Sequence, residues 1–222
     1  MERVTWLAQR RAAVRAAYDA EAPTFQEYPN SAQREWVDRL LSGCPPEGLV
    51  LDAPCGTGRY FPMVAASGRR VVGIDQSSGM VMEAQRRGIA IATHHVGLQE
   101  LEFVEEFDAA MTIDAMENVS PEDWPRVLGN LWRAVIPSGQ LYLTVEETDD
   151  DEIGKAYDRM TAEGLPAVRG EVVEGDVAGY HYYPGRDQVL RWIDETGWQL
   201  VDEGFSPEDG WAYRHLLLRR GD

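Results

Sequence analysis

A short apolar stretch that ends in an acid and leads into a glycine-rich turn is the part of this sequence best suited to hold a small ligand. Residues 49–60 read LVLDAPCGTGRY, and Asp52 closes the apolar stretch. This pattern predicts a buried strand, a tight turn and then a helix. Gly56 and Gly58 have no Cβ, so the chain can bend sharply there and a ligand can approach the backbone. The following helix would point its first N–H groups at that ligand.

A second apolar stretch, residues 71–75, also ends in an acid. Asp75 lies 23 residues after Asp52. An acid at the end of a second strand, about 20 residues after such a turn, is the arrangement by which dinucleotide-type strand–helix–strand units bind a ribose. The turn lacks the Lys-Ser/Thr pair of a phosphate-binding P-loop.

Together these stretches resemble the S-adenosylmethionine (SAM) site of the class I methyltransferases. The family's first motif reads Asp/Glu-x-Gly-x-Gly-x-Gly, and residues 52–58 read DAPCGTG. Pro54 stands where the first glycine is expected, and proline has no N–H to donate to a cofactor. Residues 107–124 resemble the family's substrate-facing fourth-strand motif. Residues 131–145 resemble its helix–turn–strand segment, which usually contains Pro-Gly-Gly.

The resemblance implies SAM as cofactor, with S-adenosylhomocysteine as its product. Asp75 would accept hydrogen bonds from the ribose hydroxyls, and Asp52 would act on the ammonium group through water. Gly97 stands where the family often has an adenine-binding acid, so Leu98 or Gln99 would take over that contact. The other residues expected to bind the cofactor are Ala53, Gly56, Gly58, Gln76, Met80 and Asp114.

Several of these residues have a structural alternative. Met80 would equally suit the core of a helix, and Asp114 would equally suit a cap on the next segment. The glycines would be needed for the turn whether or not a cofactor binds. An acid such as Asp75 is also found in solvated loops, although its position after a second strand favours the ribose role.

Methyl transfer requires an acceptor held in line with the methyl group, with the reacting atoms about 3 to 3.5 Å apart. An oxygen or nitrogen acceptor also benefits from a base with a pKa near neutral, a description that histidine fits best. His181, in GYHYYPG, is the first candidate, and Glu117 and Glu146 are the second. The alternatives are a packed histidine in an aromatic hairpin and two solvated loop acids.

Residues 148–184 break the regular alternation of strands and helices. Long loops in compact domains are usually functional or disordered, and the aromatic, alternating second half of this segment favours order. We expect it to cap the acceptor pocket, with Tyr180, Tyr182 or His181 lining the pocket and Tyr18 of an N-terminal helix on the other side. Neighbours in a strand face opposite ways, so Tyr180 and His181 cannot both point inward.

The elements that position these residues alternate five times between strand and helix, which predicts an α/β fold with a doubly wound parallel sheet. With the family resemblance, we expect a mostly parallel seven-stranded sheet, a C-terminal antiparallel strand pair and an insert after the fifth strand. Ser31 would cap the second helix. The expected sheet strands span residues 49–52, 71–75, 89–96, 107–113, 140–145, 198–204 and 211–218.

We expect residues 1–222 to form a single SAM-dependent methyltransferase domain. Its expected parts are an N-terminal helical cap (1–47), a SAM-binding core (48–147), an insert or lid (148–184) and a C-terminal helix with the strand pair (185–222). The N-terminal helices would either cover the cofactor and help to form the acceptor pocket, or act only as a packing layer. The charged N-terminus favours mature protein over a signal peptide.

The composition restricts the classes of partner that the protein is expected to bind. The net charge is −17, from 38 acidic and 21 basic residues, which argues against a nucleic-acid substrate. No run of 18 apolar residues is present, so no membrane span is expected. Two cysteines make no disulfide framework, and no Cys/His cluster has zinc spacing, so we expect reduced thiols, a cytoplasmic protein and no metal. A monomer or homodimer is expected.

The leading hypothesis is a SAM-dependent methyltransferase (EC 2.1.1 type) that acts on an oxygen or nitrogen atom of a small-molecule acceptor. Two alternatives remain open at this point, because fold does not settle function. A protein methyltransferase would have an extended acidic groove and act on a polypeptide. A non-catalytic regulatory or interaction protein would bind SAM without turnover.

Overall fold

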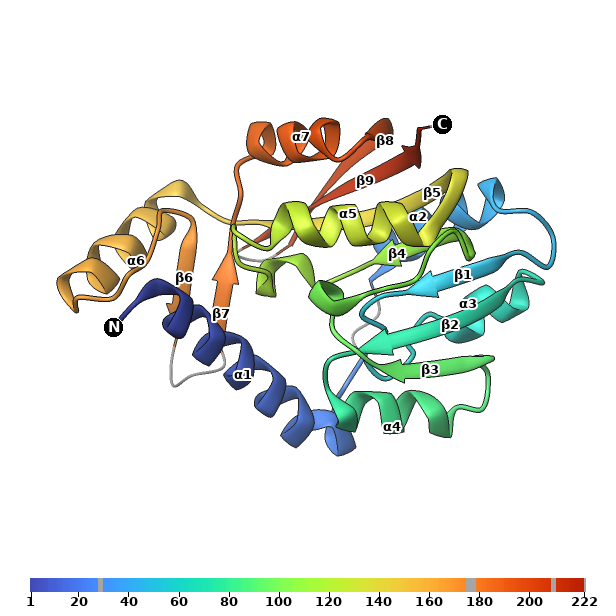
Figure 1. Ribbon diagram of the computed structural model, residues 1–222, viewed down its shortest axis with the longest axis horizontal. Helices are drawn as coiled ribbons and strands as arrows, with labels where there is room; N and C mark the ends of the chain where they lie inside the picture. Colours follow the sequence, from blue (N-terminus) through green and yellow to red (C-terminus); the bar gives the residue numbers. More distant parts are fainter. Residues whose placement is uncertain (28–29, 175–178, 209–210, 222) are drawn as a thin grey trace.

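The strands around the glycine turn form the centre of one seven-stranded sheet in the computed structural model (Figure 1), which describes residues 1–27, 30–174, 179–208 and 211–221. The strand order is β3-β2-β1-β4-β5-β9-β8. Neighbours among β1 to β5 pair in parallel, and β9 runs antiparallel to both β5 and β8. The predicted fold class is therefore confirmed. The strands are β1 (Leu49–Asp52), β2 (Arg70–Asp75), β3 (Ala92–His95), β4 (Phe107–Thr112), β5 (Val135–Glu147), β8 (Trp198–Pro207) and β9 (Ala212–Arg220).

Helices cover both faces of this sheet (Figure 1). They are α1 (Arg3–Glu21), α2 (Ser31–Gly43), α3 (Phe61–Ala66), α4 (Ser78–Arg86), α5 (Trp124–Ala134), α6 (Asp150–Ala162) and α7 (Arg186–Glu195), with three short 3₁₀ turns, η1 (Ala22–Thr24), η2 (Leu98–Glu100) and η3 (Met116–Asn118). None of these helices, within the described ranges, is both long and apolar enough to cross a bilayer.

The segment after the fifth strand holds α6 and a separate two-stranded antiparallel sheet of β6 (Glu171–Glu174) and β7 (Gly179–Tyr182). The alternating second half of this segment, for which the sequence favours order, contains the strand pair. Residues 175–178, between the two strands, lie outside the described residues. This unit projects from the end of the main sheet, beside the N-terminal half of α1 (Figure 1).

Two element boundaries differ from the sequence prediction for local reasons. β5 begins at Val135 instead of Gln140, because the expected turn at residues 136–139 is a strand irregularity: Val135 pairs with Phe107 and Gln140 with Ala109. The cap of α2 is Asn30 and not Ser31. The Asn30 side chain accepts the backbone N–H of Gln33 at 3.0 Å, which satisfies one of the donors left free at a helix start.

Helix α1 is fixed at both ends. At its C-terminal end, Asp19 Oδ1 accepts hydrogen bonds from Ser77 Oγ (2.7 Å) and Gly79 N (2.9 Å) at the start of α4. At its N-terminal end, Arg3 pairs with Glu171 of β6 at 2.9 Å. A Cβ at Gly79 would lie 2.9 Å from the Cβ of Ala22, so only glycine permits this close approach. The helix is therefore held across the carboxyl ends of the strands.

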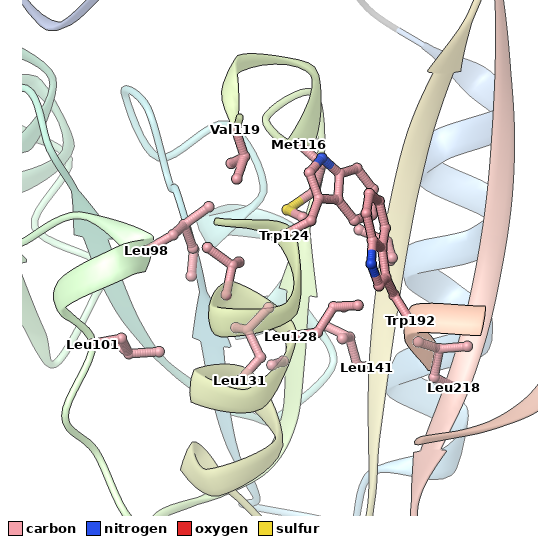
Figure 2. Close-up of a cluster of buried hydrophobic side chains, with 14 of the residues drawn as sticks. Leu98, Leu101, Met116, Val119, Trp124, Leu128, Leu131, Leu141, Trp192 and Leu218 are labelled. Carbon is pink, nitrogen blue, oxygen red and sulfur yellow. The ribbon is translucent and has the colours of Figure 1, made fainter. Parts of the chain in front are cut away.

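The larger apolar core lies between the sheet and the helices α5 and α7. Figure 2 shows Trp124 of α5 facing Trp192 of α7, with Leu128 and Leu131 filling the layer beside the sheet. The two indole rings are stacked with centroids 5.3 Å apart. A second core on the other face contains Trp36 of α2 and residues of α3.

Replacing Trp124 with alanine should remove this contact and leave a cavity, because Trp124 is fully buried. We expect Trp124→Ala to lower the free energy of unfolding by about 3–5 kcal/mol, measured by urea denaturation. The matched control is Trp211→Ala, a side chain that is 46% exposed, for which a change within about 0.5 kcal/mol is expected. Equal losses for the two variants would contradict this description of the core.

Candidate active site

The glycine turn after β1 adopts a conformation that requires glycine. Gly56 and Gly58 have φ values of +52° and +81°, in the left-handed region. A Cβ at Gly58 would lie 2.6 Å from the ring of Phe61, whereas a Cβ at Gly56 would meet no atom within 4 Å. Gly58 is thus needed for packing, and the space beside Gly56 is open for a ligand.

Asp75, at the end of β2, holds this turn from the other side. Its Oδ2 accepts the backbone N–H of Gly56 at 3.0 Å, and its Oδ1 accepts that of Ser77 at 2.8 Å. The side chain is buried, and burial raises its pKa while the two backbone hydrogen bonds oppose that shift. Each carboxylate oxygen has a further lone pair. Asp75 can therefore orient the turn and still accept a hydrogen bond from a ligand hydroxyl.

One pocket lies over the carboxyl ends of β1, β2 and β4, next to these groups. It gathers most of the residues that the sequence predicted for the cofactor, together with one predicted for the acceptor. Those lining it are Asp52, Gly56, Asp75, Gln76, Met80, Leu98, Gln99, Asp114 and Tyr18.

Two predicted residues do not line the pocket. Ala53 is fully buried in the core beneath the turn, and Gly58 packs against Phe61. Both residues shape the turn from below, and the structure does not bring their side-chain positions into the pocket wall. The N-terminal helix, by contrast, is more than a packing layer, because α1 packs Trp6 and Val14 into the core and also places Arg11 and Tyr18 at the pocket wall.

Asp52 is a buried carboxylate in the pocket wall, and not all of its oxygen atoms are hydrogen-bonded. It is 1% exposed, and its Oδ2 has no hydrogen-bond partner among the described residues. Burial raises its pKa well above the ordinary range, and the charge of Arg59 opposes that shift. A buried carboxylate oxygen in this position suits a cationic or hydrogen-bond-donating group of a ligand.

A polar network that the sequence did not reveal closes the next part of the pocket. The Arg59 guanidinium lies 2.8 Å from Oδ2 of Asp114 and donates to Oε1 of Gln33 at 3.1 Å. The Tyr60 hydroxyl donates to the same Gln33 oxygen at 2.7 Å. Arg59 and Tyr60 directly follow the glycine turn, so their position beside the pocket could have been predicted from the sequence. Gln33 comes from α2, and no motif marks it.

Asp114 follows β4 with a φ of +51°. Its backbone N–H donates to Thr144 Oγ1 at 2.9 Å, which fixes the chain to β5. Its carboxylate binds Arg59, and the following 3₁₀ turn has no side-chain cap. The alternative role of Asp114 as a helix cap is therefore not what the structure shows. Other pocket residues that the sequence analysis missed are Phe25, Glu27, Thr57, Ile113, Ala115, Asn118 and Val119.

The three candidate bases lie together beyond Asp114, over the carboxyl ends of β4 and β5. Glu117 is buried in η3, and its pKa is raised well above the usual range by burial and by the nearby charges of Glu146 and Asp114. Burial also raises the pKa of Glu146 to about 7. His181 Nδ1 lies 3.7 Å from Oε2 of Glu146 and 3.0 Å from the Tyr183 hydroxyl. None of the three is in the wall of the main pocket itself.

Tyr180, His181 and Tyr182, expected to line the acceptor pocket, are not in the wall of this pocket. The Tyr180 ring packs edge-on against Trp6, and its hydroxyl donates to Glu171 at 2.8 Å. Tyr182 packs near Trp192 in the core. Both rings are buried because they cover apolar surface, and strand alternation turns His181 toward Glu146 instead.

Neither a disulfide nor a metal cluster is present in the described part of the chain. Cys44 and Cys55 are both free and buried. No group of three or more His, Cys, Asp or Glu side chains among the described residues is placed to hold a metal ion.

Comparisons with known proteins agree with this geometry. A family model described as "Methyltransferase domain" matches residues 50–139, from β1 to the start of β5. Residues 50–139 therefore form a methyltransferase domain. The resemblance found in the sequence is confirmed.

Individual methyltransferases show how far the similarity extends. Malonyl-[acyl-carrier protein] O-methyltransferase of Serratia marcescens is 35% identical over 153 residues, which cover 66% of this chain but only 55% of that protein. Demethylmenaquinone methyltransferase of Renibacterium salmoninarum is 27% identical over 205 residues, covering 85% and 84% of the two chains. The chain thus spans little more than half the length of the Serratia relative.

Among solved structures, 1,6-didemethyltoxoflavin-N1-methyltransferase of Burkholderia thailandensis superposes with a TM-score of 0.74. It was solved with bound 1,6-didemethyltoxoflavin and S-adenosylhomocysteine. The two chains are 18% identical, and the match covers 100% of this chain and 92% of that one. At this identity the likeness shows that the methyltransferase fold is shared over the whole chain.

The raised pKa of Glu146 predicts a pH-dependent stability. The folded protein holds the Glu146 proton up to a pH of about 7, against 4.5 for the ordinary group. Stability from this group is therefore fully present at low pH and is lost as the pH rises from about 4.5 to about 7. Glutamine imitates the protonated form, so Glu146→Gln should become more stable than wild type as the pH rises toward about 8.

Urea denaturation of the two proteins at about pH 5 and about pH 8 checks this. The matched control is Glu106→Gln, at an exposed carboxylate, and the difference from wild type should change more with pH for Glu146→Gln than for this control. A Glu146→Gln variant whose difference from wild type stays constant between the two pH values would show that Glu146 titrates normally.

Proposed function

We propose that this protein transfers a methyl group from SAM to an oxygen or nitrogen atom of a small-molecule acceptor. The observation that carries the proposal is the pair of acids at the ends of neighbouring parallel strands, Asp52 and Asp75, around the open backbone at Gly56. Family membership supports it. The named relatives act on a malonyl group, on demethylmenaquinone and, in the solved structure, on N1 of a toxoflavin precursor, so both acceptor atoms occur among similar proteins.

The residues present fit this cofactor. Asp75 would accept from the ribose hydroxyls, and the orphaned Oδ2 of Asp52 would receive the ammonium group directly or through water. Gly56 would let the methionine portion approach the backbone. Gln76, Met80, Leu98 and Gln99 would surround the adenine. SAM supplies an activated methyl group on a sulfonium, so the chain has to bind, orient and exclude water.

The remaining parts of the proposal concern the whole protein. We infer a single domain in which residues 1–47 cap the site, 48–147 bind SAM, 148–184 form an insert and 185–222 complete the sheet. The insert and α1 would close the acceptor side, supported by the Asn118 hydrogen bond to the backbone of Tyr180. The net charge of −17 supports a non-nucleic-acid substrate. A cytoplasmic monomer or homodimer is the corresponding expectation.

Mass spectrometry of the purified protein tests the proposal most simply. SAM or its demethylated product should co-purify in the pocket, and incubation with labelled SAM and candidate acceptors should transfer the label. Binding of SAM without transfer to any acceptor would favour a regulatory protein, and transfer to polypeptides alone would favour a protein methyltransferase.

Asp75→Ala should weaken SAM binding about ten-fold or more, because a hydrogen bond to a charged acceptor contributes roughly 1.5–3 kcal/mol. Calorimetric titration measures this. Asp108→Ala is the matched control, since Asp108 also accepts a backbone N–H (Leu49, 2.8 Å) but at the opposite edge of the sheet. Equal affinity of wild type and a folded Asp75→Ala variant would remove the ribose assignment.

Methyl transfer should not require a metal ion, because the potential ligands among the described residues are scattered. We expect turnover to be the same before and after treatment with a chelator. Loss of activity on chelation that magnesium restores would contradict this expectation.

A further inference from the structure

A groove between helix α1 and the segments that follow β2, β3 and β4 concentrates positive charge in a chain whose net charge is −17. Its volume is about 930 Å³. The arginines that line it are Arg3, Arg10, Arg11 and Arg15 of α1 and Arg126 of α5. We call it the arginine groove. The carboxylates that line it are Glu100, Glu122 and Asp123.

Each of these carboxylates is already paired with an arginine of the groove. The pairs are Arg3–Glu122, Arg11–Glu100 and Arg126–Asp123. Arg10 and Arg15 form no ion pair within the part of the chain that the structure describes. The acids of the groove are therefore neutralised, and the charges of Arg10 and Arg15 remain available to a ligand.

Arg10 lies on the inner side of α1. It is one helical turn from Trp6 in one direction and from Val14 in the other, and both of these side chains are buried. The Arg10 side chain is half-buried, and its Nε is out of contact with water and has no hydrogen-bond partner among the described residues. Burying such a donor is costly unless a ligand satisfies it.

The arginine groove opens into the cofactor pocket. Six residues line both, namely Arg11, Gln76, Val96, Gly97, Gln99 and Asn118. Arg10 and Arg15 line only the groove, so they mark positions away from the cofactor. Tyr180 lines the groove from the insert. One molecule can therefore reach from the cofactor pocket along α1 toward Arg10.

From this arrangement we propose that the acceptor is an organic acid whose carboxylate or phosphate binds Arg10 in the arginine groove, while the atom to be methylated lies in the cofactor pocket. The inference rests on the proposed function and names its substrate class. A guanidinium presents a planar fork of N–H donors that matches two oxygens of a carboxylate or phosphate. Such a group would satisfy the buried Nε of Arg10.

The rest of the groove suits the carbon skeleton of such an acid. Val4, Leu7 and Ala8 line it beside the arginines, and Val4 is 80% exposed, so an apolar portion of the ligand would cover it. Arg15 is exposed at the surface of α1, where its charge attracts an anion that the acidic remainder of the protein repels. A neutral acceptor would leave Arg10 unsatisfied, and a cationic acceptor would be repelled by it.

Transfer of a deuterated methyl group tests the substrate class even while the substrate is still to be found. The full chain is incubated with CD₃-labelled SAM and a metabolite extract of the organism that encodes it, and labelled products are fragmented by mass spectrometry. We expect labelled products that still carry a free acid group, with loss of carbon dioxide identifying a carboxylate and a phosphate fragment identifying a phosphate. Labelled products without a free acid would overturn the inference and leave the proposed function intact. SAM binding without any labelled product would overturn both.

Variants then locate the effect at Arg10. With the acid found, Arg10→Gln should raise its KM about ten-fold or more and change kcat less, because a charge-assisted contact is lost. Arg10→Lys, which keeps the charge, should recover part of this loss. The KM of wild type should rise with salt, and that of Arg10→Gln should rise less, a difference that a purely structural role would not produce. Affinity for S-adenosylhomocysteine should stay the same, because Arg10 does not line the cofactor pocket.

A second substitution keeps the test decisive if Arg10→Gln fails to fold. Arg15→Glu reverses a charge at an exposed position and should also raise the KM for the acid. Arg191→Gln, at an exposed arginine of α7 outside the groove, is the matched control and should leave KM unchanged. Unchanged KM in Arg10→Gln and Arg15→Glu would overturn the assignment, as would an equal rise in the control.

Discussion

The site depends on one constraint: carboxylates are buried at the carboxyl ends of β1 and β4 with too few hydrogen-bond partners. Asp52 and Glu117 each keep one oxygen without a hydrogen-bond partner among the described residues. Leaving such groups charged inside the protein costs several kcal/mol, so burial holds their pKa values high. A ligand that brings positive charge or N–H donors offsets this cost, and binding it stabilises the folded chain.

The rest of the structure makes that burial possible. Helix α1 closes the edge of the sheet where the acids lie, and it is held by Asp19 at α4 and by Arg3 at β6. The two anchors belong to different parts of the fold, since α4 follows β2 and β6 belongs to the insert. Helix α1 can therefore exclude water from both halves of the site at once, which strengthens the electrostatic interactions inside.

The sequence predicted the part of the pocket at the ends of β1 and β2 better than the part beyond β4. Asp52, Gly56 and Asp75 were recognisable because strand ends and a left-handed turn impose particular residue types at fixed spacing. Gln33 is joined to Arg59 and Asp114 only by tertiary packing of α2, which no local pattern records.

The two tyrosines of β7 show a related limit. Alternation predicted that Tyr180 and His181 face opposite sides, and the burial pattern of β7 follows that rule. Alternation does not tell which side faces the ligand. The orientation of β7 follows from packing, because the Tyr180 ring contacts Trp6 and the Tyr182 ring contacts Trp192. The extension of β5 back to Val135 has a similar origin, because it depends on pairing with β4.

The two halves of the site also differ in how their acids are satisfied. At the end of β2, Asp75 receives backbone N–H groups on both oxygens, so it is oriented before any ligand arrives and suits neutral hydroxyls. Beyond β4 and β5, burial and the charge of Glu146 raise the pKa of Glu117, although backbone hydrogen bonds to its carboxylate oppose that shift. Glu117 therefore holds its proton to a higher pH than an ordinary glutamate does. A parallel sheet brings both kinds of acid to the same edge, where backbone N–H groups around Asp75 and neighbouring carboxylates around Glu117 shift their pKa values in different ways.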